Sequence, residues 1–493
     1  MSVEETDGGA WSTRIGFILA AVGSAIGLGN IWRFPYQVHA NGGGAFLIPY
    51  FAALLLAGIP VLIVEIWLGS ETGLTTPLAI REKFKESEFL GWWAVLNGFI
   101  VNAYYVVILG WSAAFIVFAI THGFDLTTGD FFTNFKAFLT SWYPVAGVIV
   151  IWAVNYVILQ LGIEDGLERA NKLFVPFIWV LVILLAVRGM MLPSGLEGLE
   201  FYLTPDFGAL ADPGIWISAF GQIYFTLSVA LGIMITYASY QPEDQDITNN
   251  AFIIAFANSG FAFLAGFAIF PYLVAADAGA TDSIGLAFVV LPQAFQTIPF
   301  TPIVGAIFFL LLTLAGLSSS LSLAEAQVGP LRQKLGLGRA KTVNAVALAG
   351  VALSLVIALE GPLGLLGSGE AIGDSLQLLS MFDASSATYT LPMIALGETL
   401  IFGWVYGVGT FDGGQRIADA ANAVSDFSIP PRLYAVVLQI VVPTALGYTI
   451  LSQIVVDGKT GLIAPLVIIF SAAISSYVTQ RADTVAANGG DDA

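Results

Sequence analysis

The chain contains no cysteine, only two histidines, and few charged side chains, which make up 11% of its 493 residues. Without cysteine, disulfide bonds and thiolate metal or redox sites are excluded. Soluble globular proteins carry about 25% charged residues, so this composition argues against a water-soluble fold. Basic residues number 17 against 35 acidic ones, and no basic face exists for a nucleic-acid partner. The net charge of −18 fits either acidic loops and tails or a host with a salt-rich interior.

Apolar residues are abundant, at 57% of the chain with a mean hydropathy of +0.84. Long apolar runs recur, and each approaches the roughly 20 residues that a membrane-spanning helix needs. The clearest runs are residues 15–26, 46–66, 173–187, 345–359 and 462–478. The sequence therefore predicts an all-α polytopic membrane protein of about twelve spans, or eleven because the last run is short. Its acidic start lacks the basic region of a cleavable signal peptide, so we expect the first span to be retained.

The basic residues indicate an orientation. With the N-terminus in the cytoplasm, nearly all lysines and arginines fall in cytoplasmic loops, where membrane proteins carry an excess of them. Only Lys136, Arg188 and Lys459 fall outside, and Arg33 lies within the membrane. We therefore expect a multi-pass protein of the plasma membrane with both termini in the cytoplasm.

Two of the expected spans are interrupted. The first contains "GSAIGLGN" (23–30) and the sixth contains "FTLSVALG" (225–232). Five spans separate their starts, so the two halves of the chain would run in opposite directions. A single glycine-rich segment more often marks close helix packing. Paired breaks in two inverted halves instead point to a secondary transporter with its site at mid-membrane.

A broken membrane helix needs a physical reason, because unpaired backbone groups are costly in lipid. Freed carbonyl oxygens suit a dehydrated cation, and freed N–H groups at the start of a half-helix suit a carboxylate. The two breaks therefore predict a joint site for a cation and an anionic group, and an amino acid offers such a group.

Several further motifs occur in a characteristic order: "GLGNIWRFPY" (27–36), "NGGGAF" (41–46), "GQIYFTLS" (221–228), "SYQPEDQDI" (239–247) and "AGLSSS" (315–320). Together they resemble the neurotransmitter:sodium symporter family, which includes the bacterial leucine transporter, over nearly all of residues 11–425. The resemblance implies the leucine-transporter-like fold, a 5+5 inverted repeat in which helices 1 and 6 are broken. The implied organisation is a cytoplasmic tail (1–10), helices 1–5 (11–188), an extracellular loop (189–213), helices 6–10 (214–425), helices 11–12 (426–478) and a second cytoplasmic tail (479–493).

The resemblance also implies two bound sodium ions and no catalytic residue. Sodium site 1 would comprise Ala25, Asn30, Thr226 and Asn258, and sodium site 2 would comprise Gly23, Ile26, Ala315, Ser318 and Ser319. The substrate's own carboxylate would complete site 1, which couples ion binding to substrate binding. Such neutral oxygens suit an alkali ion. Considered without the resemblance, the serines can bond to carbonyls of their own helix, and the asparagines can join neighbouring helices.

The implied substrate site is mostly apolar and contains no charged side chain. It would be lined by Ser24, Ala25, Leu28, Gly29, Val101, Tyr105, Phe225, Thr226, Ser228, Leu231, Ser319 and Leu323. Gly27 stands where the family's monoamine carriers have an aspartate that replaces a missing substrate carboxylate, so the substrate should bring its own. The predicted function is sodium-coupled import of a neutral, hydrophobic amino acid by alternating access. The alternatives are transport of another small zwitterion (glycine, betaine or GABA-like) and a non-transporting amino-acid sensor.

Two gates follow from the same resemblance. At the external mouth, Arg33 would pair with Asp383. At the cytoplasmic side, the family pattern retains Trp11, Ser239 and Tyr240.

The usual cytoplasmic ion pair is missing, because Gly8 and Gln333 replace its arginine and aspartate. We therefore expect inner closure by packing and neutral hydrogen bonds, or by charges such as Arg14 and Glu325. Residues 166–176, bracketed by a glycine and a proline, match a family motif associated with local unwinding of the fifth span.

Other features exclude competing functions or leave questions open. An enzyme would need a nucleophile–base pair or metal ligands, and a channel would need charged pore rings; the sequence shows neither. Glu65 and Glu398 are expected to make structural hydrogen bonds, with proton transport as the lesser alternative. Chloride dependence stays open because Ala262 replaces the residues that distinguish the two classes. Amino-acid substrate and membrane lipid are the expected partners, and the oligomeric state is not determined.

Overall fold

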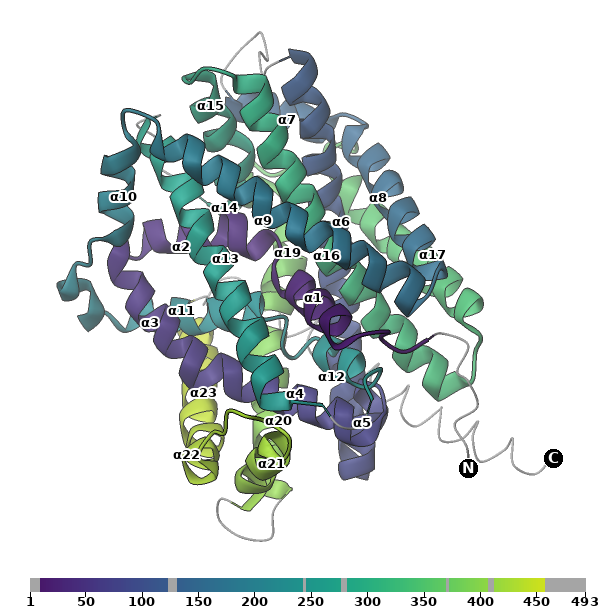
Figure 1. Ribbon diagram of the computed structural model, residues 1–493. Helices are drawn as coiled ribbons and strands as arrows, with labels where there is room; N and C mark the ends of the chain where they lie inside the picture. Colours follow the sequence, from purple (N-terminus) through teal and green to yellow (C-terminus); the bar gives the residue numbers. More distant parts are fainter. Residues whose placement is uncertain are drawn as a thin grey trace.

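The computed structural model describes residues 9–122, 131–242, 245–275, 282–368, 372–406 and 412–456. Within these ranges the chain is a bundle of helices without a β-strand (Figure 1). Short π-helical and 3₁₀ segments, labelled η, interrupt or join the α-helices. The expected all-α membrane fold is confirmed, and the second acidic tail lies outside the described residues.

The first half of the bundle contains five spans and their connecting helices. The spans are α1 (Arg14–Ala25) with η1 (Gly29–Arg33) and α2 (Phe34–Ala40); η2 (Gly44–Phe46) with α3 (Leu47–Ala53), η3 (Leu54–Gly58) and α4 (Ile59–Thr72); α6 (Glu88–His122); α8 (Tyr143–Gln160); and η5 (Ile163–Glu168) with α9 (Arg169–Met190). The connections are α5 (Thr76–Lys83), η4 (Lys85–Ser87), α7 (Phe131–Thr140), α10 (Gly195–Leu203) and η6 (Phe207–Ala211).

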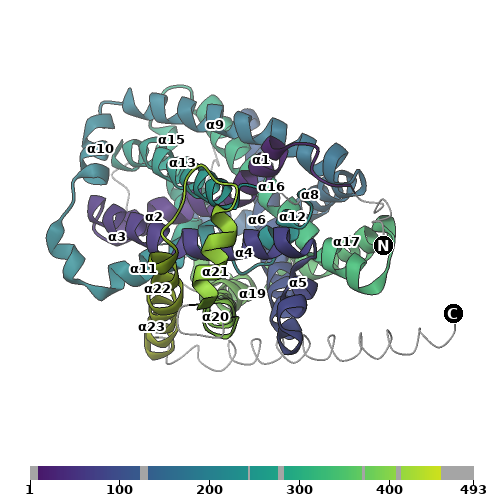
Figure 2. The same cartoon turned by 60° about the horizontal axis from the view of Figure 1, so that its bottom comes forward.

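The second half follows the same scheme. Its spans are α11 (Pro213–Thr226) with α12 (Ile233–Ala238); α13 (Ile247–Ala275); α16 (Thr301–Leu335); α17 (Arg339–Ala358); and α19 (Gln377–Asp383) with η8 (Ala384–Thr390), α20 (Leu391–Leu400) and η9 (Ile401–Val405). The connections are α14 (Ser283–Gly285), η7 (Leu286–Val290), α15 (Leu291–Gln296), α18 (Ile372–Ser375) and α21 (Asp412–Asn422). An eleventh span, α22 (Pro431–Val436) with η10 (Val437–Val441) and α23 (Val442–Val456), lies at the edge of the bundle beside α20 (Figure 2).

Eight of the described helices are long and apolar enough to cross a membrane, and the bent pair at the N-terminus makes a ninth. The expected sixth and tenth spans are not among them, and the sixth is divided into the two short helices α11 and α12, of 14 and 6 residues. The expected twelfth span lies outside the described residues.

The outer helices present apolar side chains where a soluble protein would present polar ones. On α9, the exposed residues Leu173, Phe177, Val180 and Leu184 form a stripe at helical spacing. Such a stripe is unfavourable in water and suits contact with lipid chains.

The centre of the bundle is joined by buried polar contacts. The hydroxyl of Ser320 on α16 donates to Asn102 Oδ1 on α6 (2.7 Å), and Asn155 on α8 donates to the same hydroxyl (2.8 Å). All three side chains are fully buried. Interhelical hydrogen bonds of this kind hold membrane helices together, so α16 is fixed against two neighbours.

The first span is broken after Ala25. The α1 helix ends because Ile26 is extended (φ −76°, ψ 100°), and helical structure resumes at Gly29. The two halves meet at an angle of 52°. The break therefore falls inside the interrupted segment expected from the sequence.

The second break lies between α11 and α12, at residues 227–232. Ser228, Ala230 and Gly232 all have positive φ, at 55°, 59° and 73°. For the two non-glycine residues this conformation costs about 1–2 kcal/mol each. The carboxylate of Glu65 on α4 accepts a hydrogen bond from the Ala230 N–H, which supports the strained segment.

Candidate functional site

A small central cavity of about 30 Å³ lies between the two breaks. It is lined by Ser24, Ala25, Gly27, Gly29, Asn30, Val101, Tyr105, Phe225, Thr226, Ser228, Leu231, Ser319 and Leu323. All the substrate-site residues expected from the sequence are in this set except Leu28, which lines a second cavity nearer Arg33. Among the residues that the structure describes, no charged side chain lines the central cavity.

Tyr105 connects α6 to the first break. Its hydroxyl accepts a hydrogen bond from the Leu28 N–H at 2.7 Å. The phenol therefore caps one of the backbone groups that the break leaves free, and its own hydrogen remains able to donate to an anion. Leu28 thus contributes its backbone N–H to this side of the site, although the residue lines the outer and not the central cavity.

Gly27 leaves space that any side chain would fill. A Cβ atom built there would lie 2.4 Å from the Tyr105 hydroxyl oxygen and 2.6 Å from Ser319 Oγ. Both distances are too short for real contacts. The absence of a side chain at this position is therefore a requirement of the site as it is built.

The residues expected at sodium site 1 are brought together. Asn30 Nδ2 donates to Asn258 Oδ1 (2.8 Å), and the Thr226 hydroxyl donates to the same oxygen (3.3 Å). Asn30 Oδ1 accepts from the Gly27 N–H at 3.1 Å. Ala25 lines the cavity beside them. These groups offer a cluster of neutral oxygens at the first break.

The residues expected at sodium site 2 converge from α1 and α16. The Ser318 hydroxyl lies 2.7 Å from the carbonyl oxygens of both Gly23 and Ala315. The Ser319 hydroxyl lies 3.5 Å from the Ile26 carbonyl and 3.4 Å from the Ala315 carbonyl. Five neutral oxygens are thus gathered in one place, and this donor set fits a hard monovalent cation.

Arg33 and Asp383 both line the second cavity, which measures about 310 Å³ and is called the outer cavity below. The guanidinium of Arg33 lies over the Phe225 ring, 4.6 Å from its centroid. Phe225 also lines the central cavity, so its ring separates the two spaces. No ion pair joins Arg33 to Asp383 among the described contacts, and in this conformation the expected gate pair is not closed.

A third cavity of about 550 Å³, called the inner cavity below, lies on the opposite side. It is lined by Gly9, Ala10, Gly73, Thr75, Ser239, Tyr240, Gln241, Gly329, Arg332, Gln333, Gly336, Leu337 and Gly338. The Trp11 indole N–H donates to the Tyr237 carbonyl at 2.8 Å, and the Trp11 N–H donates to the Tyr240 carbonyl at 3.2 Å. Trp11 is thus buried against Tyr237 and Tyr240, and Tyr240 lines this cavity.

The charges on the inner side differ from the usual pair. Glu325 and Arg339 form a buried bidentate pair, with N–O distances of 2.8 and 3.1 Å, and the Tyr240 hydroxyl donates to Glu325 (3.0 Å). Gln333 accepts from the Thr75 N–H and hydroxyl, both at 2.7 Å. The sequence named Glu325 as a candidate but did not reveal its partner. Gly8 lies outside the described residues.

Residues 166–176 are helical in this conformation. They begin in η5, continue into α9, and place Pro176 inside the helix. The two buried carboxylates Glu65 and Glu398 lie on α4 and α20, with Glu65 bonded to Ala230 as described above.

Comparisons with known proteins agree on one family. A family model described as the sodium:neurotransmitter symporter family matches residues 8–137 and 140–462. An uncharacterized sodium-dependent transporter, MJ1319 of Methanocaldococcus jannaschii, is 38% identical over 97% of this chain and 98% of its own length. The human sodium- and chloride-dependent GABA transporter 2 is 30% identical over 83% of this chain and 76% of its own length.

Among solved structures, the crystal structure of MhsT in complex with L-phenylalanine is similar to this fold. The TM-score is 0.79 and the sequence identity is 33%, and the match covers 90% of this chain and 99% of that one.

Proposed function

Because the chain belongs to the sodium:neurotransmitter symporter family and has the multiple apolar helices of a multi-pass membrane transporter, we propose that it imports a neutral, hydrophobic amino acid together with sodium. Transport proceeds by alternating access: the site between the two breaks opens to one side of the plasma membrane at a time. No covalent bond changes, so the protein acts as a carrier and not as an enzyme.

The observation that carries the proposal is the convergence of oxygens from two distant helices. The Ser318 hydroxyl and the Gly23 carbonyl oxygen are 2.7 Å apart, and Ser319 adds a second hydroxyl beside the Ile26 carbonyl. A sodium ion at this point binds α1 to α16. A second sodium ion beside Asn30 and Asn258 is completed by the substrate carboxylate, so each ligand strengthens binding of the other.

The substrate class follows from the lining of the central cavity. Tyr105 and the backbone N–H groups near Leu28 face the carboxylate of the substrate. The side-chain half, with Val101, Leu231 and Leu323, contains no charge, and a charged substrate side chain would be buried there without a partner. The solved structure of MhsT contains L-phenylalanine, which agrees with a neutral side chain. The second candidate is another small carboxylate-bearing zwitterion (glycine, betaine or GABA-like), and the observation behind it is the small volume of the central cavity, about 30 Å³.

The test is uptake into proteoliposomes with an inward sodium gradient. A panel of neutral, charged and non-α amino acids is offered, with chloride varied separately because the relatives include a chloride-dependent transporter. We expect saturable uptake of neutral amino acids that stops when sodium is replaced by choline. Uptake that continues without sodium would contradict the proposal, and sodium-linked binding without uptake would favour a sensor.

A further inference from the structure

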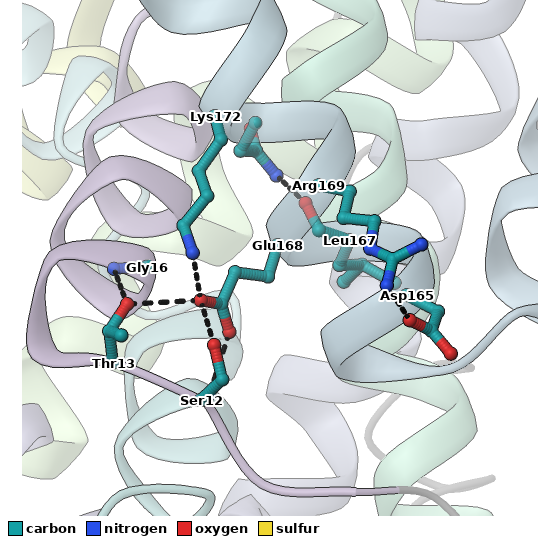
Figure 3. Close-up of polar contacts among 9 residues, drawn as sticks. Ser12, Thr13, Gly16, Asp165, Leu167, Glu168, Arg169 and Lys172 are labelled. Atoms are coloured by element: carbon teal, nitrogen blue, oxygen red, sulfur yellow. Dashed lines mark hydrogen bonds and ion pairs between the residues drawn. The ribbon is translucent and has the colours of Figure 1, made fainter.

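The N-terminal segment, residues 9–13, is held against the start of α9 by a single carboxylate. Glu168 accepts from the Ser12 N–H at 2.8 Å, the Ser12 hydroxyl at 2.6 Å and the Thr13 hydroxyl at 3.0 Å (Figure 3). Lys172, one turn further along, lies 2.6 Å from the same carboxylate. These four donors satisfy a side chain that is only 1% exposed. The carboxylate therefore joins two separate segments of the chain.

The surface of α1 is shaped to receive this carboxylate. A Cβ atom at Gly16 would lie 2.2 Å from the Glu168 carboxyl group, so only glycine leaves room for it. Two turns later, a Cβ atom at Gly23 would lie 2.4 Å from Asn171 and 2.9 Å from Val175. The two glycines, seven residues apart, form a groove in which one face of α9 lies. The packing of α1 against the fifth span therefore fixes the position of the Glu168 side chain.

Residues 9–13, which Glu168 holds in place, also carry Trp11 at the inner side of the bundle. Trp11, next to Ser12, packs its ring against Tyr237 with 5.0 Å between centroids and donates to the Tyr237 carbonyl. The Tyr237 hydroxyl in turn donates to Ser322 on α16 at 2.7 Å. If residues 9–13 leave, Trp11 leaves with them, and its ring no longer covers Tyr237 and the Ser322 hydroxyl to which Tyr237 is bonded.

The start of the fifth span, which carries Glu168, is also the less regular part of that span. Glu168 ends the π-helical segment η5, which follows Gly162 at φ +93°. π-Helical segments are less favourable than α-helix and often occur at functional positions. Pro176 removes a backbone donor further along. A change in the winding of η5 would move Glu168 and break its contacts with Ser12 and Thr13 together.

We propose that Glu168 is the positioning residue of the inner gate: its carboxylate clasps Ser12 and Thr13 and holds Trp11 in place until the start of the fifth span moves. The clasp performs with hydrogen bonds the closing function that an ion pair at Gly8 and Gln333 would otherwise supply. The proposal rests on the transport cycle proposed above, but it can be tested without a transported substrate.

The absence of native cysteine makes the test direct. Ser322→Cys serves as an inner reporter, and Ser380→Cys, which lines the outer cavity, serves as an outer reporter. Each is labelled in liposomes by a membrane-impermeant maleimide, with and without Glu168→Gln. We expect Glu168→Gln to raise the rate of labelling at the inner reporter roughly tenfold, which is the factor expected from the loss of a charge-assisted hydrogen bond. The rate of labelling at the outer reporter should fall.

Matched variants distinguish gating from general damage. Asp165→Asn removes a carboxylate three residues away that pairs with the exposed Arg169 and lies apart from Ser12 and Thr13 (Figure 3), so it should leave both reporters unchanged. Glu168→Asp should restore part of the closure. Unchanged inner labelling in Glu168→Gln overturns the proposal, and so does a rise at both reporters, which indicates loosening of the fold. Sodium-driven uptake of an amino acid by the unaltered chain is measured separately, so a failure of the proposed function is seen independently.

Discussion

The hydroxyl of Ser318 lies 2.7 Å from the carbonyl oxygen of Gly23, although 295 residues separate them in the chain. The contact joins α16 to the end of α1, where the first span breaks. A hydroxyl takes up this position only because α16 is packed against the break, with Ala315 and Ser319 offering further oxygens. The break and the serines of α16 therefore form one site.

Gly27 sets a steric limit on the substrate site. We expect Gly27→Asp to abolish binding of amino acids that carry a carboxylate, because even a Cβ atom there would lie 2.4 Å from the Tyr105 hydroxyl oxygen. The check is the rise in melting temperature on adding sodium and substrate, which reports ligand binding to the folded state. Gly221→Ala is the control, since a Cβ atom there has no neighbour within 4 Å. Unchanged stabilisation of the aspartate variant would argue against the assigned site.

The second break stores strain at Ala230. We expect Ala230→Gly to raise the free energy of unfolding by about 1 kcal/mol, because a left-handed conformation is costly for a residue with a Cβ atom. Gly232→Ala should act in the opposite direction, since its φ is +73° and the new Cβ atom would lie 2.9 Å from Thr76 Oγ1. Thermal unfolding in detergent measures both changes. The idea fails if the two substitutions shift stability in the same direction.

The pair of Glu325 and Arg339 should matter far more than an exposed pair. Arg339→Gln leaves a buried carboxylate without its cation, and we expect a loss of about 3–5 kcal/mol. Arg169→Gln breaks the exposed pair with Asp165 and should cost no more than about 1 kcal/mol. The double variant Glu325→Gln/Arg339→Gln should recover part of the loss. Equal effects of the two arginine substitutions would show that burial of the pair contributes little.

The sequence was sufficient for the local features of this fold. The interrupted segments "GSAIGLGN" and "FTLSVALG" predicted both breaks, and the family resemblance predicted nearly all the residues that line the central cavity. Ser228 and Ala230 show the limit of such patterns, because their positive φ is imposed by packing around residues 227–232 and not by residue type. Leu28 lines the outer cavity and not the central one, and the sequence pattern does not predict this difference.

Contacts between distant segments were harder to predict. The sequence names Glu325 as a candidate charge for inner closure, but Arg339 lies on another helix and nothing in the local pattern points to it as the partner. The sequence does not single out Glu168, because acidic residues are common where a membrane span begins and such a position indicates no particular contact. Gly16, which leaves room for its carboxylate, was the available signal, but a glycine in a membrane helix fits many explanations. The expected pairing of Arg33 with Asp383 describes a closed mouth, and the structure places both residues in the lining of the outer cavity without an ion pair between them among the described contacts.

The most direct measurement for the central claim is a sodium titration of amino-acid binding to the unaltered chain and to Ser318→Ala. Thr313→Val serves as the control, because within the described part of the chain its hydroxyl bonds only to the Phe309 carbonyl of its own helix. We expect the sodium concentration for half-maximal binding to rise about tenfold or more in Ser318→Ala, corresponding to a loss of about 1.4 kcal/mol, and to stay unchanged in the control. If Ser318→Ala binds substrate with the same sodium dependence as the unaltered chain, the oxygens of α1 and α16 do not hold the coupling ion.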